Sequence, residues 1–330
     1  MGILSAFLGT IIGYSVPGEE SNALNGLHGY NNYLVGLGIC FCDAEIYLNN
    51  NVWYQFGQLV LPMVFSSLFC SFLHLWICNS IRGLTFAYNI GLSVWLAFAV
   101  SLGPNSVYCP TMISPEIPAP SSASIEYSMI NIEWVFRGIF AGIGQVFFVP
   151  QLEPGLTIFC ALALGSPIAA FLAFCGSSIG LLVSVLTHSS EYNASVGLDG
   201  LSAVLASIAL GGFYFVPSKY SFLLAAIGSV LCVPMRQFFV SLLANHNGPS
   251  MTFSFCAVAT VLFASKWPVA VPPALLHSVE RHLISRMRAM QSVAKLDKGV
   301  STDTNELSNW PDLMAHHYAR PGTPNPDIPI

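Results

Sequence analysis

A glycine-led segment that occurs twice, 171 residues apart, constrains this chain more than any other feature. The segment 26–34 (GLHGYNNYL) returns at 197–205 as GLDGLSAVL, with two Gly and two Leu at matching positions. Each copy opens an apolar run of about 12 to 16 residues, which is too short to cross the roughly 30 Å hydrocarbon core of a bilayer as a helix. Backbone that ends at membrane depth is tolerated only where protein buries it or where it lines a wet cavity. We therefore expect two re-entrant half-helices, and paired interrupted segments of this kind point to a transport site.

The repeat extends well beyond these two segments. Four residues near the N-terminus recur 167 positions later: Phe7, Gly9, Ile12 and Gly13 return as Phe174, Gly176, Ile179 and Gly180. Thr85 and Thr252 share the same offset, and self-similarity over this length indicates an internal structural repeat. Around the half-helices, apolar runs predict helices at 2–16, 53–78, 83–103, 130–148, 155–164, 167–186, 220–244 and 251–264. The tripeptide Gly-Ser-Pro at 165–167 is expected to break the helix there.

The composition places these runs in a membrane. The chain is 54% hydrophobic and only 8% charged, whereas soluble domains carry about 25% charged residues. We therefore expect an all-α, multi-pass membrane protein. Residues 266–330 hold nearly half of the charged side chains and are rich in Lys and Arg. The tail is therefore expected in the cytoplasm, whereas the segment 101–128, which has no Lys or Arg, is expected outside.

The second copy of the repeat is longer than the first. About 45 residues separate position 130 from Phe174, but only six residues precede Phe7. We expect a complete repeat to hold five membrane helices and one half-helix, and the first repeat to lack about two of these helices. An odd number of crossings inverts the second copy relative to the first, as in many transporters. The predicted division is an incomplete first repeat at 1–103, an extracellular linker at 104–128, a second repeat at 129–265 and a cytoplasmic tail at 266–330.

No residue pattern points to a metal ion or a cofactor. The nine cysteines lie mostly in apolar runs without metal-ligand spacing, so we expect buried, inert thiols and neither a metal nor a cofactor. In the tail, apolar residues recur at helical spacing over 275–296 beside basic ones. This pattern suits a helix lying on the anionic inner leaflet. A partly ordered soluble helix fits the same pattern.

Several segments resemble those of the urea transporter family over roughly residues 5–264. They are GLHGYNNYLVG at 26–36, GIGQVFF at 142–148 and GSPIAAFLAFCGSSIG at 165–180. The resemblance implies a passive, channel-like urea pathway through each subunit of a homotrimer in the plasma membrane. The family's LPxxTxPF signature is degraded here: it reads IRGLTFAY at 81–88 and GPSMTFSF at 248–255, which keep the threonine but lose prolines.

The resemblance also implies a set of pathway residues. They are Tyr30, Asn31, Leu34, Thr85, Gln145, Phe148, Leu201, Leu205 and Thr252. Urea is flat, neutral and rich in N–H donors, so a selective slot must offer acceptor oxygens along one edge and apolar groups against its faces. By resemblance, Thr85 and Thr252 supply midplane oxygens, and Leu34 and Leu205 form the apolar constriction. All four stand at repeat-matched positions, although core packing alone would account for the leucines.

Further along the path, the resemblance makes Gln145 an acceptor and Phe148 a gripping ring. The two are three residues apart and are expected to share a helix face, although a membrane glutamine can also simply bond a neighbouring helix. Inward-pointing half-helix N-termini are expected to disfavour cations through their partial positive charge. We also expect that replacing Gly29 or Gly200 with alanine clashes wherever the backbone there needs positive φ.

Two other functions remain open at this point. The degraded signature allows a transport-inactive paralogue or a channel for other small neutral amides. An intramembrane enzyme would need Ser177 or Ser178 as nucleophile and His188 as base. Thr10, the repeat counterpart of Ser177, has no nearby histidine in the sequence, so the hydroxyl is better explained as a contact between helices, and no enzyme activity is expected.

Overall fold

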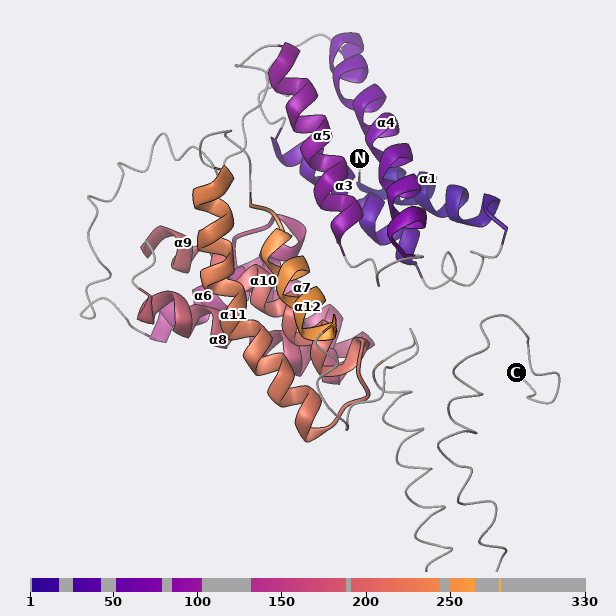
Figure 1. Cartoon of the computed structure of the whole chain (residues 1–330). Helices are drawn as coiled ribbons and strands as arrows, with labels where there is room; N and C mark the ends of the chain where they lie inside the picture. Colours follow the sequence, from indigo (N-terminus) through magenta and orange to yellow (C-terminus); the bar gives the residue numbers. More distant parts are fainter. Residues whose placement is uncertain are drawn as a thin grey trace, which may run out of the picture.

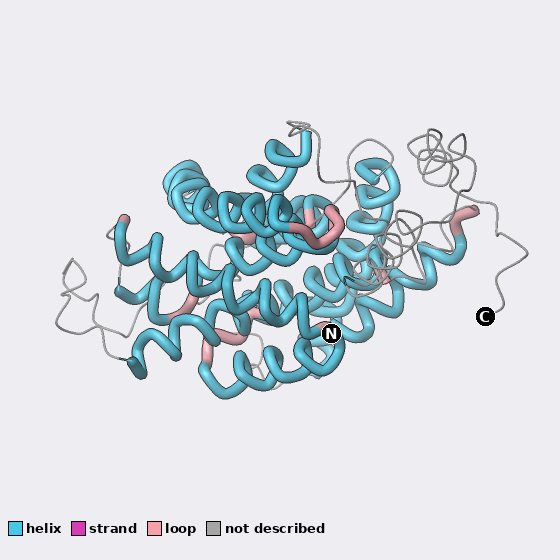
Figure 2. Tube along the Cα trace, turned by 90° about the horizontal axis from the view of Figure 1, so that it is seen from below, coloured by secondary structure: helices cyan, strands magenta, loops and turns pink. Residues whose placement is uncertain are grey.

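The computed structural model describes residues 2–17, 26–42, 52–78, 85–102, 132–187, 191–243, 250–264 and 279. Nearly all of these residues belong to helices joined by short turns (Figure 2). The predicted extracellular linker at 104–128 lies outside the described residues, as does the tail at 266–330 apart from Val279.

The helices follow one another in a simple order (Figure 1). They are α1 Gly2–Ser15, α3 Leu27–Cys42, α4 Val52–Cys78, α5 Phe86–Leu102, α6 Ile132–Gly144, α7 Leu152–Gly165, α8 Pro167–Leu186, α9 Glu191–Ser195, α10 Leu198–Ile208, α11 Lys219–Leu243 and α12 Phe253–Ala264. Within the described part, α8 and α11 are long and apolar enough to cross a membrane. Residues 132–147 and α7 form an apolar pair bent by 73°, the geometry of a broken span or of a re-entrant loop. The predicted all-α membrane architecture is confirmed.

The sequence repeat is also a repeat of helix packing. In the first group α1 packs on α3, and α3 packs on α4 and α5; in the second group α8 packs on α10, and α10 packs on α11 and α12. Figure 1 shows the two groups as an indigo-to-purple cluster and a magenta-to-orange cluster. They meet where α5 contacts α12. Residues that precede these two helices therefore face each other across the boundary between the groups.

Helices α3 and α10, at the two predicted half-helices, both begin just after a glycine in the left-handed conformation. Gly26 has φ of 76° and Gly197 has φ of 73°, a region that costs an L-residue with a Cβ roughly 1–2 kcal/mol. A Cβ on Gly197 would lie 2.1 Å from the backbone nitrogen of Gly142, whereas one on Gly26 would meet nothing within 4 Å. The first glycine of each motif therefore sets the direction of entry into α3 or α10.

The condition of positive φ is not met at Gly29 or Gly200. Both lie inside helices, and neither is among the positive-φ glycines of the described residues. Their lack of a Cβ instead permits a close approach of helices: a Cβ on Gly29 would stand 2.9 Å from Thr10 Oγ1, and one on Gly200 would stand 3.1 Å from Ser177 Oγ. Thr10 and Ser177 are repeat counterparts, so the same contact occurs twice.

The predicted helix at 130–148 ends earlier than expected. Helix α6 stops at Gly144, and a 3₁₀ turn over Gln145–Phe147 leads to Phe148, which has φ of 62°. The N–H of Val149 donates to the Gly144 carbonyl at 3.2 Å and the N–H of Phe148 donates to the Gln145 carbonyl at 3.0 Å, the bond pair of a Schellman helix end. Gln145 and Phe148 therefore do not share an α-helical face.

The predicted break at 165–167 is confirmed. Helix α7 ends at Gly165 and α8 begins at Pro167. Ser166 caps α8, because its hydroxyl accepts the N–H of Ala169 at 3.2 Å. Pro167 occupies the first helical position, where its missing N–H costs nothing.

Candidate transport site

Thr85 and Thr252 meet at the boundary between the two helix groups. Their Oγ1 atoms lie 2.7 Å apart, and the residues are only 2% and 5% exposed. Each stands immediately before a helix, and its carbonyl accepts the first helical bond: Asn89 N–H to Thr85 at 2.9 Å, and Cys256 N–H to Thr252 at 3.0 Å. The threonines were expected inside their spans; the structure makes them the capping residues of α5 and α12.

Two further side chains close a ring with the threonines. Thr252 Oγ1 donates to Asn89 Oδ1 at 2.9 Å, and Asn89 Nδ2 donates to Cys256 Sγ at 3.4 Å. Cys256 Sγ in turn lies 3.2 Å from Thr85 Oγ1. We call Thr85, Thr252, Asn89 and Cys256 the Thr–Asn–Cys ring. Sequence reasoning missed Asn89 and Cys256, although they follow the threonines by four residues each and share the repeat offset of 167.

One apolar cluster flanks this ring on the side of the first repeat. It contains Leu34 and Tyr88, with Tyr30 and Phe148 packed against them. The Phe148 ring centroid lies 5.3 Å from that of Phe41 and 6.4 Å from that of Tyr88. The structure therefore brings three of the predicted pathway residues, Tyr30, Leu34 and Phe148, into one cluster.

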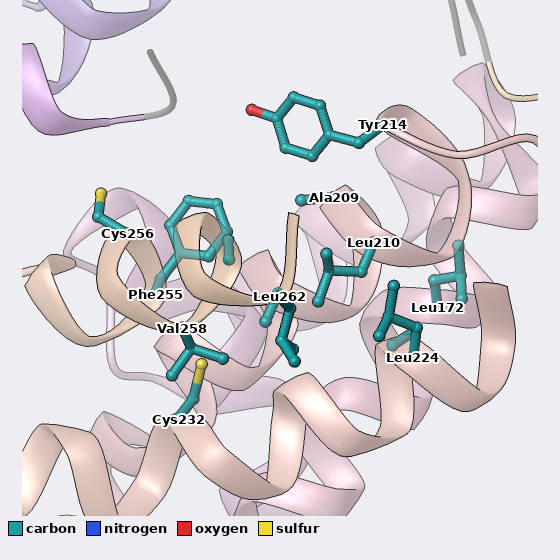
Figure 3. Packing of buried hydrophobic residues seen from close by; sticks show 13 residues of the cluster. Leu172, Ala209, Leu210, Tyr214, Leu224, Cys232, Phe255, Cys256, Val258 and Leu262 are labelled. Carbon is teal, nitrogen blue, oxygen red and sulfur yellow. The ribbon is translucent and has the colours of Figure 1, made fainter. Parts of the chain in front are cut away.

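A second apolar cluster flanks the ring on the side of the second repeat. It contains Phe255 and Cys256, and Leu205 and Phe86 pack against it. Figure 3 shows the Cys256 thiol pointing away from Val258 of the same cluster. Leu34 and Leu205 thus lie in separate clusters, and Cys256 belongs both to the second cluster and to the ring.

Gln145 is tied to the start of the second half-helix. Its side chain is buried, and Nε2 donates to the Val196 carbonyl at 3.1 Å, directly before Gly197. This bond uses one of the two N–H donors of the carboxamide, so the side chain keeps its Oε1 acceptor and one N–H. The contact also fits the alternative that Gln145 links helices.

The remaining predicted residues lie on α3 and α10. Asn31 is buried on α3, with Nδ2 at 3.5 Å from His74 Nδ1, so it faces α4. Leu201, the counterpart of Tyr30, is half-buried on α10. Ser202, the counterpart of Asn31, shares a hydrogen bond of 2.6 Å with Ser254, which occupies the position of a lost signature proline.

A buried ion pair that sequence reasoning missed anchors α10. Asp199 Oδ1 lies 2.7 Å from Arg236 Nη1, and Ser184 Oγ donates to Asp199 Oδ2 at 2.6 Å. The Asp199 and Arg236 side chains are 1% and 8% exposed. Charged residues inside apolar runs are rare and expensive, which is the signal that could have identified them. Asp199 stands in the first turn of α10. Its negative charge therefore offsets the partial positive charge of the helix N-terminus, which was expected to exclude cations, and Arg236 in turn pairs with Asp199.

The hydroxyls considered for an enzyme are engaged with helix carbonyls. Ser177 Oγ donates to the Ile139 carbonyl at 2.6 Å, and Ser178 Oγ donates to the Phe174 carbonyl at 2.8 Å. His188, the proposed base, lies outside the described residues. Ser177 therefore links α8 to α6, whereas Ser178 bonds back to its own helix, α8.

Comparisons with known proteins agree with the sequence resemblance. A family model described as Urea transporter matches residues 1–266. The chain is 26% identical to Urea transporter 1 of Rattus norvegicus and of Mus musculus over 266 residues, and 25% identical to Urea transporter 1 of Ovis aries. Each match covers 79% of this chain and 66% of the relative. The chain therefore spans just under two thirds of the length of these relatives.

Proposed function

Because the chain belongs to the urea transporter family, we propose that it carries urea passively across a membrane, through a narrow path beside the Thr–Asn–Cys ring. The observation that carries this proposal is the hydroxyl pair of Thr85 and Thr252, 2.7 Å apart between two apolar clusters. A slot for urea requires oxygens at one edge and apolar walls at the faces. The ring and its two clusters supply both kinds of group within one region of the protein.

Each pathway residue has a definite part in this proposal. Thr85 and Thr252 replace water at the N–H groups of urea, and Gln145 Oε1 offers a further acceptor. On one side the urea face packs against the cluster of Leu34, and on the other against the cluster of Leu205. Because urea is neutral and the walls are apolar, ions would lose hydration here without compensation.

The arrangement of the two groups belongs to the same proposal. The packing order of the first group recurs in the second, which supports a structural repeat. We propose that the two repeats are related by inversion in the membrane plane. We propose that three copies assemble, each with its own path, in the plasma membrane, and that the tail from 266 lies in the cytoplasm.

A second candidate is a channel for other small neutral amides. It is favoured by Ala87 and Ser254, which stand where the family signature has proline. Ser254 introduces a buried hydroxyl bonded to Ser202 beside the path, and this changes the polarity of one wall. Relative rates for urea, acetamide and water distinguish the two candidates.

The proposal is tested with the purified full chain in liposomes. Stopped-flow light scattering should show urea entry several-fold faster than in empty vesicles, and Thr85→Val or Thr252→Val should slow it about fivefold, the effect of one lost hydrogen bond. Ser229→Ala is the matched control, because the Ser229 hydroxyl is buried outside the ring, 2.9 Å from the Ala225 carbonyl and 3.1 Å from the Ala203 carbonyl. Urea entry no faster than in empty vesicles, with well-folded protein, would refute transport.

A further inference from the structure

We infer that Asn89 fixes the direction of every hydrogen bond in the Thr–Asn–Cys ring, so that both threonine hydroxyls face a solute as acceptors only. Asn89 is thereby a positioning residue for the donor groups of urea. The inference rests on the proposed function for its substrate, but the bond directions follow from the geometry of the ring alone.

The orientation of the Asn89 carboxamide is set by the backbone. The N–H of Thr252 lies 3.2 Å from the same Asn89 atom that the Thr252 hydroxyl contacts at 2.9 Å. A backbone N–H can only donate, so this atom must be the oxygen, Oδ1. The other end of the carboxamide is then the NH₂ group, which donates to Cys256 Sγ at 3.4 Å.

The remaining directions follow from counting protons. A hydroxyl has one proton, and Thr252 gives its proton to Asn89. The 2.7 Å contact between the hydroxyls therefore needs the proton of Thr85. Thr85 then has none left for Cys256, so the 3.2 Å contact between them is made by the thiol proton. The ring runs in one direction: Cys256 to Thr85, to Thr252, to Asn89, and back to Cys256.

This direction decides what a solute can bind. Each threonine oxygen accepts one bond and donates one bond within the ring, which leaves one lone pair free. The pair of hydroxyls thus presents acceptors and no proton. Urea N–H groups match these acceptors, whereas a solute with fewer N–H groups, such as 1,3-dimethylurea, matches them less well.

The asymmetry between the two repeats gives the ring this single direction. Asn89 and Cys256 are repeat counterparts, and both are buried, so water does not substitute for either. With two thiols, neither end of the threonine pair would be preferred as donor. With two carboxamides, each carboxamide oxygen would accept a proton from one threonine hydroxyl, and no proton would remain for the 2.7 Å contact between the two hydroxyls. One carboxamide and one thiol select one direction, and bonds that run in one direction strengthen one another.

The test is a double-mutant cycle that exchanges the two counterparts. Asn89→Cys and Cys256→Asn should each lower urea flux in liposomes about fivefold, as expected for the loss of one ordinary hydrogen bond. The double variant Asn89→Cys/Cys256→Asn reverses the ring but keeps both threonines as acceptors, so its flux should return to within about twofold of the unaltered chain. Ser229→Ala, which removes a buried helix contact elsewhere, should leave flux unchanged.

Two further readouts separate this role from a structural one. The ratio of urea flux to 1,3-dimethylurea flux should fall in the single variants, whereas a general loss of packing lowers both alike. The infrared S–H band of Cys256, obtained as the difference from Cys256→Ala, should show a hydrogen-bonded thiol that weakens in Asn89→Leu. Single variants with unchanged flux and ratio, or a double variant no better than the singles, would overturn the inference. A chain that carries no urea would overturn the proposed function instead, while the S–H band would still test the ring direction.

Discussion

Removing Arg236 while keeping Asp199 should strongly destabilise the protein, because it leaves a buried carboxylate without its counter-charge. The Asp199 side chain is 1% exposed, with one oxygen 2.7 Å from Arg236 and the other bonded by Ser184 at 2.6 Å. Arg236→Leu leaves that carboxylate buried without its counter-charge, which costs about 3–5 kcal/mol in comparable pairs. Net stabilities of folded proteins are about 5–15 kcal/mol, so this single substitution removes a large part of the total.

Thermal unfolding in detergent, followed by size-exclusion chromatography of heated samples, measures this effect. The matched control is Lys219→Leu, which removes a positive charge from the exposed start of the same helix and should change stability by less than about 0.5 kcal/mol. The double variant Asp199→Leu/Arg236→Met replaces the pair with apolar groups and should recover most of the loss. If Arg236→Leu melts at the same temperature as Lys219→Leu, the pair does not hold α8, α10 and α11 together.

Two further substitutions test the backbone and the pathway. Gly197→Ala should lower the melting temperature more than Gly26→Ala. Both substitutions strain a positive φ at roughly 1–2 kcal/mol, but only the Cβ at position 197 would meet Gly142, at 2.1 Å. Thermal unfolding measures both variants, and equal shifts in melting temperature would contradict this assignment. Gln145→Leu leaves the Val196 carbonyl without the donor that lies 3.1 Å from it. The variant should lose about 1–3 kcal/mol of stability and should carry urea into liposomes more slowly. Reduced stability with unaltered urea entry would mean that Gln145 only links helices.

The large-scale organisation of the fold could be predicted from the sequence because it depends on local composition. The paired Gly motifs located α3 and α10, and Gly-Ser-Pro located the break between α7 and α8, since proline and glycine act on the backbone where they stand. The end of α6 could not be predicted, because it depends on Phe148 adopting φ of 62°, a conformation that no local rule assigns to phenylalanine. Positive φ occurs at the first glycine of each motif, which precedes the helix, and not at the second.

The candidate site could be predicted only in part, since its parts come from distant segments. The threonines were found through the repeat, but Asn89 and Cys256 became meaningful only once α5 and α12 were seen to meet. Asp199 and Arg236 are 37 residues apart in the sequence, and no spacing rule joins them.

The two repeats preserve helix packing while their buried polar contacts have diverged. Three positions on α4 match three positions on α11 at an offset of 162 residues: Ser67, Cys70 and His74 correspond to Ser229, Cys232 and Arg236. At the offset of 171, His28 corresponds to Asp199. The ion pair of the second repeat therefore corresponds to the contact between His28 and His74 in the first, whose ring centroids lie 4.6 Å apart. Small residues fix how closely helices approach, so both copies must keep them. A polar pair only has to satisfy its own bonds, so it can change wherever both partners change together. Asn89 and Cys256 are a second pair of matching positions that has diverged. This difference, at the boundary between the repeats, gives the hydrogen bonds of an otherwise symmetric pair of threonines a single direction.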